Sequence, residues 1–418
     1  MNKRRLVELC DVIVPMRDKP KEFVTEENGI PWCRIEDIEG KFLNGSKSEK
    51  YVSKECIERM NLKVFPVGTV LCAVTGASIG TYAITTRELI TNQTFAGLVC
   101  KENLLYNEFL YYYIKMHTST FINNSVGCAQ AYITRETLEN FLIPDLEYDE
   151  QVRLVEVLKH LDDKIKINNE SNVELELMTR TIYDYWFLQF DFPDENGKPY
   201  KSSGGKMVWN EELKREIPEG WKRKIIGEIV SFENGDRGKN YPSGEDFKRE
   251  GIPFINGSMI NSNRILYNEL QYINEEKYNQ LRAGKAGKGD ILLTLRGSLA
   301  KCSYNPFERA AIASALVIAR PKKEINNTFL YYLLNSDYLK RLYKNYDNGS
   351  IQANLSVDTL KSFDCIVPTT EVLILWNEII GEIDKKISYL QQENQELVSL
   401  RDFLLPLLMN GQVGFREC

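Results

Sequence analysis

The sequence predicts an α+β protein in which two tandem, pseudo-twofold-related modules are separated by two long antiparallel coiled-coil helices. Three observations support this fold class. The 418-residue chain is too long for one ordinary hydrophobic core. Its two halves repeat the same phrases at an offset of about 222 residues. Each half also ends in a long heptad pattern.

The repeat is clearest in an aromatic phrase, which reads NEFLYY at residues 107–112 and NTFLYY at residues 327–332. Other phrases keep the same order and nearly the same offset in the two halves. They are Gly29–Ile38 with Gly251–Ile260, Val70–Gly80 with Ile291–Ala300, and Gly127–Phe141 with Gly349–Phe363. Collinear matches at one spacing indicate a tandem duplication, because chance similarity would not preserve both order and distance.

Each copy begins with a module of about 145 residues that combines strand-like and helical patterns. Short apolar runs at residues 70–74, 291–295 and 316–319 predict buried strands, and Gly-rich stretches connect them. The FLYY phrase predicts a helix in each copy. This mixture indicates an α+β module.

After each module, apolar residues recur at alternating steps of four and three, which is the pattern of a coiled-coil seam. The first run extends from Leu154 to Ile182, and the second extends from Trp376 to Leu404. Helices of about 35–40 residues would reach roughly 55 Å. We expect the two helices to pair with each other antiparallel; the alternative is that each packs on its own module. Three asparagines on the seam are interpreted as register-setting polar residues: Asn168, Asn172 and Asn394.

These patterns divide the chain into five predicted segments. They are a first module (residues 1–147), a first spacer helix (148–190), a connector rich in Pro, Gly and Ser (191–218), a second module (219–368) and a second spacer helix (369–410).

The formal net charge of −6 is distributed unevenly along the chain. Residues 221–370 carry 22 Lys and Arg against 16 Asp and Glu, whereas residues 148–190 carry 5 against 9 and residues 371–418 carry 4 against 8. Such asymmetry is compatible with nucleic acid meeting one surface and protein meeting another.

No membrane segment and no disulfide framework are expected. The longest uncharged apolar stretch, around residues 310–319, is about half of what a membrane span requires. Glu8 and Asp11 interrupt the apolar run near the N-terminus, which argues against a secretory signal. Nine cysteines without a CxxC pair fit reduced, mostly buried thiols. The protein is therefore expected to be cytoplasmic.

The sequence lacks the residue combinations that common catalytic sites require. Its two histidines, His117 and His160, stand alone in helical patterns and have no counterpart in the other copy, so neither is expected to be a general base or a metal ligand. The run GKPYKSSGGKM resembles a phosphate loop, but Lys206 is followed by Met207 and no strand leads into it. Asn305-Pro306-Phe307 resembles part of the tetrapeptide of amino methyltransferases but lacks its second proline. No catalytic residue and no metal site are expected.

Polar and basic residues at equivalent places in the two copies are the candidates for binding. The predicted strands at 70–74 and 291–295 are each followed by a glycine-containing turn, where side chains and backbone amides can approach a partner closely. Arg, Gln and Asn side chains make paired hydrogen bonds with base edges in the DNA major groove. The alternative interpretation is ordinary turn chemistry and surface polarity. The candidate DNA-binding residues are Thr75, Gly76, Ala77, Ser78, Gln130 and Tyr132 in the first copy, and Arg237, Lys239, Arg296, Gly297, Ser298, Lys301, Gln352 and Asn354 in the second.

With these motifs, the whole chain resembles the specificity subunit of type I DNA restriction-modification systems. The resemblance rests on the GIP-(W/F) entries at residues 29 and 251, the turns after the two strands, the FLYY helices, and the exits at Pro144 and Pro368. The connector WFLQFDFPDENGKPYKSSGGKMV and the phrase IPEGW at residues 217–221 are also typical of this family.

The resemblance implies a non-catalytic subunit that reads double-stranded DNA. Each module would be a target recognition domain for one half of a split, asymmetric sequence. The helices would set the distance between the halves, about one duplex turn or roughly 34 Å. They would also dock two adenine methyltransferase subunits that use S-adenosylmethionine, and restriction/translocase subunits that use ATP and Mg²⁺ would join this core. No cofactor is expected in this chain itself.

Two other functions stay open at the level of the sequence. A self-contained methyltransferase or nuclease with diverged motifs would act on DNA without partners. A coiled-coil adaptor would bind only proteins. If the chain does read DNA, Thr75 in the first copy and Arg296 in the second imply that the two modules read different bases.

Overall fold

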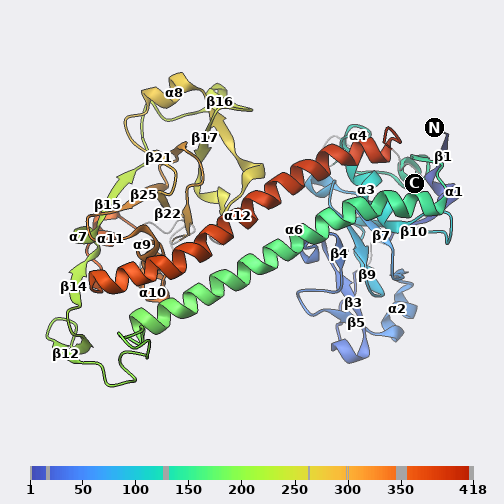
Figure 1. The fold of residues 1–418 in the computed structure, drawn as a ribbon. Helices are drawn as coiled ribbons and strands as arrows, with labels where there is room; N and C mark the ends of the chain where they lie inside the picture. The colour runs from blue at the N-terminus through green and yellow to red at the C-terminus, as the bar shows by residue number, and fades with distance from the viewer. Residues whose placement is uncertain are drawn as a thin grey trace, which may run out of the picture. The chain divides into compact units, whose positions relative to one another are not determined.

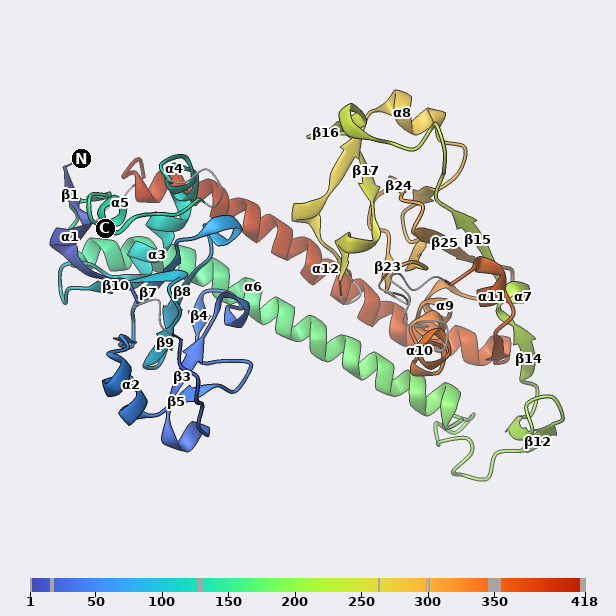
Figure 2. The same ribbon diagram turned by 180° about the vertical axis from the view of Figure 1, so that it is seen from behind.

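A computed structural model describes residues 2–15, 19–125, 131–261, 264–297, 299, 301–344 and 355–413 (Figures 1 and 2). The chain divides into two compact units, which are unit 1 (residues 1–169 and 391–418) and unit 2 (residues 170–390). The division falls inside both long helices, α6 (Tyr148–Tyr183) and α12 (Thr370–Met409). Each unit therefore contains one module together with part of each long helix.

Unit 1 is built on two small sheets. The first has the order β2 (Cys10–Ile13), β10 (Phe95–Cys100), β7 (Val70–Ala73), β8 (Tyr82–Thr85) and β4 (Phe42–Leu43). The second has the order β5 (Tyr51–Val52), β3 (Ile30–Cys33), β9 (Leu89–Thr91) and β6 (Val64–Phe65). Outside these sheets, β1 (Lys3–Arg5) pairs with β11 (Leu142–Pro144). The α-helices of the module are α1 (Leu6–Leu9), α2 (Lys54–Met60), α3 (Asn107–Met116), α4 (Thr118–Asn123) and α5 (Arg135–Glu139), and short 3-10 helices stand at Glu26–Asn28, Ile35–Asp37 and Gly76–Ser78.

Unit 2 also contains two main sheets. One has the order β15 (Val230–Asn234), β25 (Leu316–Pro321), β22 (Ile291–Thr294) and β23 (Cys302–Tyr304). The other has the order β16 (Phe247–Lys248), β20 (Gln271–Ile273), β17 (Ile252–Ile255), β24 (Arg309–Ile312) and β21 (Lys285–Gly287). Three strand pairs flank them: β12 (Met207–Asn210) with β13 (Arg215–Pro218), β14 (Lys222–Ile225) with β26 (Asp364–Val367), and β18 (Ile260–Asn261) with β19 (Arg264–Ile265). The helices are α7 (Ile226–Ile229), α8 (Glu275–Gln280), α9 (Asn327–Leu334), α10 (Asp337–Lys344) and α11 (Val357–Lys361).

The two units repeat one topology, which confirms the predicted duplication. The order β2-β10-β7-β8 of unit 1 recurs as β15-β25-β22-β23 in unit 2, and the order β5-β3-β9-β6 recurs as β20-β17-β24-β21. The three predicted strands are β7, β22 and β25. The copies differ in their edge strands. In unit 1 an extra strand, β4, lies next to β8 in the first sheet, whereas in unit 2 an extra strand, β16, lies next to β20 in the second sheet.

The repeated FLYY phrase is the core helix of each module. Phe109 and Leu110 on α3, and Phe329 and Leu330 on α9, are completely buried. In unit 1, α3 contacts β7 and β8, and in unit 2, α9 contacts β23 and β25. Apolar side chains on both helices cover the sheets, so the phrase is retained in both copies by packing.

The second tyrosine of the phrase also bonds to a long helix in each unit. In unit 1 the hydroxyl of Tyr112 donates to Asp162 of α6. In unit 2 the hydroxyl of Tyr332 donates to Oδ1 of Asp384 of α12 at 2.8 Å. The two aspartates are separated by the repeat offset of about 222 residues, so the module and its helix were duplicated together.

The long helices pair antiparallel within each unit, as the heptad pattern predicts. In unit 1, Asn168 of α6 donates to Oδ1 of Asn394 of α12 at 2.9 Å, and Asp162 forms an ion pair with Arg401 at 2.9 Å. In unit 2, the ring of Tyr183 at the end of α6 packs against Trp376 near the start of α12, with ring centroids 5.9 Å apart. The alternative, in which each helix packs only on its own module, is therefore wrong. Among the helices of the described residues, none combines the length and apolar character that a membrane crossing requires.

Candidate nucleic-acid interface

The sheet topology gathers the predicted binding turns at one end of a sheet in each unit. In unit 2, β15 and β22 both lie antiparallel to β25, so both strands end where β25 begins. In unit 1, β2 and β7 have the same relation to β10. We call this end the loop edge; it consists of the residues after β2 and β7, or after β15 and β22, and those just before β10 or β25.

In unit 1 the loop edge brings Thr75–Ser78 together with Tyr132. The backbone N–H of Gly76 donates to the carbonyl of Ala131 at 2.7 Å, and Thr75 forms a β-bridge with Tyr132. Gly76 has a φ of +58°, which suits glycine. The Ser78 hydroxyl donates to the carbonyl of Thr75 at 2.5 Å, so its oxygen is left to accept a further hydrogen bond.

Tyr132 is the most accessible large side chain of this group, with 45% of its surface exposed. Ala77 is also exposed, and Thr75 and Ser78 are half-buried. Gln130 lies outside the described residues. The loop edge of unit 1 therefore presents hydroxyl and aromatic groups rather than charges at the predicted positions.

In unit 2 the corresponding turn presents Arg296 and Gly297, both exposed. The N–H of Leu295 donates to the carbonyl of Ala315 at 3.0 Å, and its carbonyl accepts from Leu355 at 2.9 Å. The same bonds occur in unit 1, where Val74 pairs with Thr94 and Ile133. The turns that carry Thr75 and Arg296 are thus structurally equivalent, as the sequence predicts. Ser298, Gln352 and Asn354 lie outside the described residues.

Three further predicted cations belong to the loop edge of unit 2. Arg237 and Lys239 follow β15 and are exposed. Nη2 of Arg237 donates to the carbonyl of Ser314 at 3.5 Å, in the same short segment that bonds Leu295. Lys301 immediately precedes β23, the strand next to β22, and its backbone N–H donates to the Thr294 hydroxyl at 3.0 Å. The structure therefore brings these cations to the end of the sheet that carries Arg296.

Sequence comparison did not identify Arg282, which lies beside Arg237. Its side chain is 70% exposed, and Nη2 donates to the carbonyl of Arg237 at 3.3 Å. Arg282 falls outside every repeated phrase, so the comparison of the two copies could not single it out. Gly235 and Gly284 let the two loops approach each other, and these glycines are the feature of the sequence that could have pointed to Arg282.

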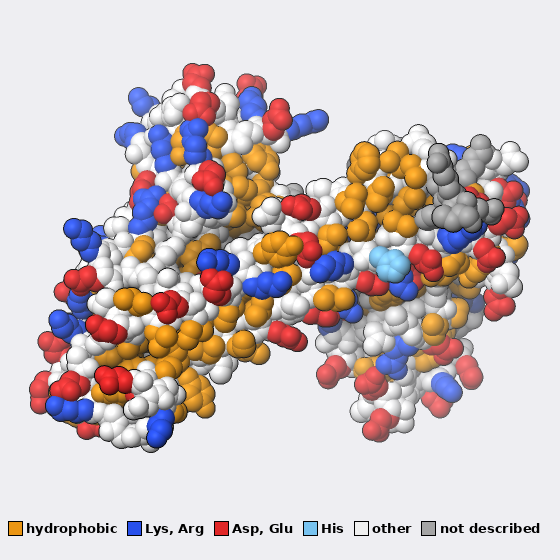
Figure 3. Space-filling view, viewed as in Figure 1, with side chains coloured by type: hydrophobic (Ala, Val, Ile, Leu, Met, Phe, Trp, Pro, Cys, Tyr) orange, Lys and Arg blue, Asp and Glu red, His pale blue; other side chains and the backbone are white. Residues whose placement is uncertain are grey.

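Apolar side chains are also exposed on the long helices in each unit. In unit 2, Figure 3 shows apolar side chains along α6. The exposed apolar residues of the long helices are Ile167, Leu400 and Phe403 in unit 1, and Val173, Leu177, Met178, Ile374, Ile379 and Tyr389 in unit 2. These side chains are available for contact with another protein.

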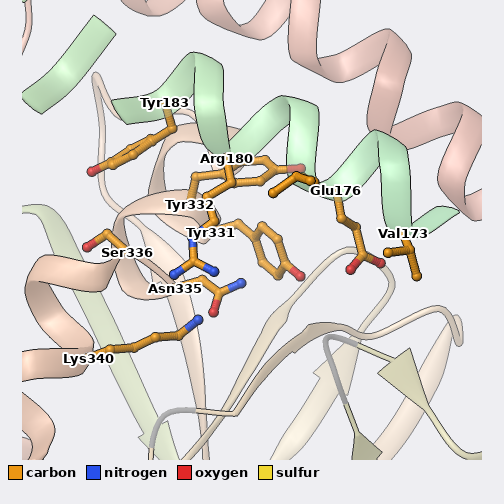
Figure 4. Close-up of a pocket in the computed structure, with 10 residues that line it drawn as sticks. Val173, Glu176, Arg180, Tyr183, Tyr331, Tyr332, Asn335, Ser336 and Lys340 are labelled. Carbon is orange, nitrogen blue, oxygen red and sulfur yellow. The ribbon is translucent and has the colours of Figure 1, made fainter. Parts of the chain in front are cut away.

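A cavity of about 180 Å³ lies between α6, α9 and α10 of unit 2 (Figure 4). Arg180 and Lys340 reach into it from opposite helices, and Arg180 also forms an ion pair with Asp337. Burial and the neighbouring Arg180 lower the pKa of Lys340. None of the lining residues belongs to the loop edge, so the cavity is separate from the candidate interface.

Asn305 and His117, which were considered as possible parts of catalytic sites, form hydrogen bonds with the protein backbone. Asn305 is buried, and its amide donates to the carbonyls of Gly287 and Phe307 at 2.8 and 2.9 Å. Nδ1 of His117 donates to the carbonyl of Tyr113 at 2.9 Å. Within the described part of the chain, no three His, Cys, Asp or Glu residues are grouped to hold a metal ion, and the seven described cysteines are free.

Comparisons with known proteins agree on one family. The family model described as "Type I restriction modification DNA specificity domain" matches residues 1–177 and 218–399, one segment in each copy of the repeat. The type I restriction enzyme MjaIX specificity subunit of Methanocaldococcus jannaschii is 27% identical over 395 residues, which cover 93% of this chain and 88% of the relative. The type I restriction enzyme EcoBI specificity subunit of Escherichia coli is 23% identical over 375 residues, which cover 89% and 76%.

A solved structure has the same fold. The crystal structure of the type I restriction-modification system S subunit from M. genitalium aligns with 100% of this chain and 96% of its own, with a TM-score of 0.54 and 19% identity.

Proposed function

Because the chain belongs to the type I restriction-modification DNA specificity family, we propose that it selects the DNA sequence on which a restriction-modification complex acts. Each unit reads one half of a split target in double-stranded DNA. The chain supplies recognition and no catalysis, since the family is one of specificity subunits. Because its target is cellular DNA, the proposal places the protein in the cytoplasm.

One observation carries this proposal: equivalent loop edges present unlike chemical groups. Thr75–Ser78 and Tyr132 occupy the edge of unit 1, while Arg296, Arg237 and Lys301 occupy that of unit 2. Arg makes paired hydrogen bonds with guanine, whereas hydroxyl groups bond to several bases and a tyrosine ring gives apolar contact. The two units share one topology but carry different side chains at the loop edge. They are therefore expected to recognise two different half-sites, which together make an asymmetric target.

The long helices set the gap between the half-sites and bind partner proteins in this proposal. Their antiparallel pairing supports a ruler of fixed length, about one duplex turn or roughly 34 Å. Their exposed apolar residues support the docking of two adenine methyltransferase subunits. S-adenosylmethionine binds those subunits, and restriction/translocase subunits supply ATP- and Mg²⁺-dependent steps. This chain holds no cofactor of its own.

Methyl transfer and DNA binding by the purified chain test the proposal. The chain alone should transfer no labelled methyl group from S-adenosylmethionine to DNA, and reconstitution with its methyltransferase should give transfer at a defined sequence. Transfer by the chain alone would identify a self-contained enzyme. A reconstituted complex without any sequence preference in a gel-shift assay would identify an adaptor that binds only proteins.

A further inference from the structure

A buried carboxylate joins two loops at the loop edge of unit 2. Asp236 is 6% exposed. Its Oδ1 accepts from the backbone N–H of Arg237 at 2.7 Å, and its Oδ2 accepts from the backbone N–H of Arg282 at 2.8 Å. Nη2 of Arg282 also lies 3.5 Å from Oδ1. The backbone N–H of Arg282, then that of Arg237, lowers the pKa of Asp236, so the group is a carboxylate at neutral pH.

Glycines let these loops meet backbone to backbone. Gly284 has a φ of +77°, and a Cβ there would lie 2.7 Å from Cα of Gly235. A Cβ on Gly235 would lie 2.5 Å from the carbonyl oxygen of Ala313. Any larger residue would push the three segments apart. The close approach of the backbones is what places both loop N–H groups on the two oxygens of Asp236.

Both arginine side chains are held at this junction by backbone carbonyls. Arg282 donates from Nη2 to the carbonyl of Arg237 at 3.3 Å, and Arg237 donates from Nη2 to that of Ser314 at 3.5 Å. A guanidinium group has five N–H donors, so each retains donors for a ligand. Side chains restrained in this way lose less rotamer entropy when they bind.

Unit 1 does not have the residues for this junction. The topologically equivalent positions of Gly235 and Gly284 are Pro15 after β2 and Lys63 before β6. Neither side chain permits the backbone contact that the two glycines make. Among the described residues, this junction is therefore found only in the second module.

We propose that Asp236 is a positioning residue that aligns Arg237 and Arg282 as a pair of DNA-phosphate contacts beside the Arg296 turn. The inference rests on the proposed function and adds Arg282 to the predicted interface. Arginine binds phosphate through parallel N–H donors, so its orientation decides the contact. Phosphate contacts fix the register of the module on the duplex, while base contacts near Arg296 supply specificity.

The direction in which Asp236→Asn changes DNA affinity distinguishes a positioning role of Asp236 from an effect of net charge. Removing a negative charge at a phosphate-binding surface should tighten binding to DNA if net charge alone matters. Replacing Asp236 by asparagine removes that charge but also disrupts the alignment of two arginines. The proposal therefore predicts weaker binding from a variant that is more positively charged.

The experiment uses the full-length chain reconstituted with the methyltransferase of its own system, with a mixed-sequence duplex as probe and fluorescence anisotropy over a salt series. Arg282→Gln should weaken binding about 3- to 10-fold and reduce the slope of log K against log salt by about 1. Asp236→Asn should weaken binding by about the same factor, because the asparagine amide keeps one acceptor oxygen for the two loop N–H groups and places an NH2 donor against the other. The double variant Asp236→Asn/Arg282→Gln should bind more weakly than Arg282→Gln by less than the full factor that Asp236→Asn costs alone, since Asp236 acts partly through Arg282 and partly through Arg237.

Two matched variants are the controls. Glu245→Gln removes an exposed carboxylate from the same unit and should leave binding unchanged or tighter. Arg309→Gln removes an arginine at the far end of β24, where it pairs with Glu275, and should leave binding unchanged. Thermal unfolding confirms that each variant is folded; if Asp236→Asn is not, Arg282→Gln decides the question.

Unchanged binding by Arg282→Gln, or binding by folded Asp236→Asn that equals or exceeds that of the wild type, would overturn this inference and leave the proposed function intact. Failure of the wild-type complex to bind any duplex would instead remove the proposed function itself.

Discussion

Asp384→Asn is expected to stabilise unit 2 at neutral pH. Oδ1 of Asp384 accepts from the Tyr332 hydroxyl at 2.8 Å, and Oδ2 accepts from that of Tyr304 at 3.2 Å. Burial nevertheless raises the pKa of Asp384 to about 6; the two tyrosine hydroxyls oppose this, and the nearby Glu176 adds to it. The structure thus holds a carboxylate where a neutral group would be favoured.

The size and sign of the effect follow from this shift. The unfolded chain releases the proton near pH 3.9, whereas the folded protein holds it up to about pH 6. The stabilisation is complete below pH 3.9 and is lost as the pH rises through 6. A shift of about two pKa units corresponds to about 3 kcal/mol. At pH 7.5 the asparagine variant should therefore gain about 1–3 kcal/mol, and below about pH 4 the gain should vanish.

Asp162→Asn in unit 1 is the matched control with the opposite sign. Asp162 stands at the equivalent position of the repeat, but it faces Arg401 at 2.9 Å with side chains 27% and 22% exposed. The residue equivalent to Arg401 in unit 2 is Thr179. Removing the charge of Asp162 leaves the partly buried Arg401 paired only with Asp402 among the described residues, so this variant should lose about 1–2 kcal/mol at pH 7.5.

Denaturant unfolding at pH 4 and pH 7.5 provides the measurement. Four of the five tryptophans belong to unit 2, and Trp186 and Trp376 lie in the same core as Tyr332. Tryptophan fluorescence therefore reports mainly on unit 2, and circular dichroism follows the whole chain. A loss of stability in Asp384→Asn at pH 7.5, or a gain that does not depend on pH, would refute the reasoning.

Three other variants test separate parts of the structure. Arg296→Ala should relax one position of one half-site by about 1–3 kcal/mol, and a methylation map would show it; equal loss over all sequences would instead mark a phosphate contact. Asn172→Leu should raise the free energy of unfolding by about 1–3 kcal/mol, because Asn172 is fully buried and its amide has no hydrogen-bond partner among the described residues. No gain would mean that the amide is satisfied in solution. Exchange of residues 1–147 for the module of a related protein should change only one half of the target, and a change in both halves would contradict independent reading.

The duplication could be predicted from the sequence because it left long, collinear matches. The FLYY phrase persists in both copies because its helix packs under a sheet and its second tyrosine bonds to Asp162 or Asp384. The heptad seam was equally visible, since Leu158 and Trp376 had to be apolar to be fully buried. Patterns of this kind report packing, which constrains many positions at once.

The details of the binding surface could not be predicted in the same way. The sequence assigned whole helices to separate segments, but each compact unit contains parts of both, because the antiparallel pairing is a long-range contact. Asp236 and Arg282 are 46 residues apart and belong to no repeated phrase. Their association depends on the backbone contact at Gly235 and Gly284, which only the folded chain brings together.

Mapping of methylated adenines in the genome of the host tests the central claim most directly. Two modules of one topology but different loop edges predict a motif with two unlike specific halves and a fixed unspecified gap between them. A single uninterrupted motif, or two identical half-sites, would contradict the account.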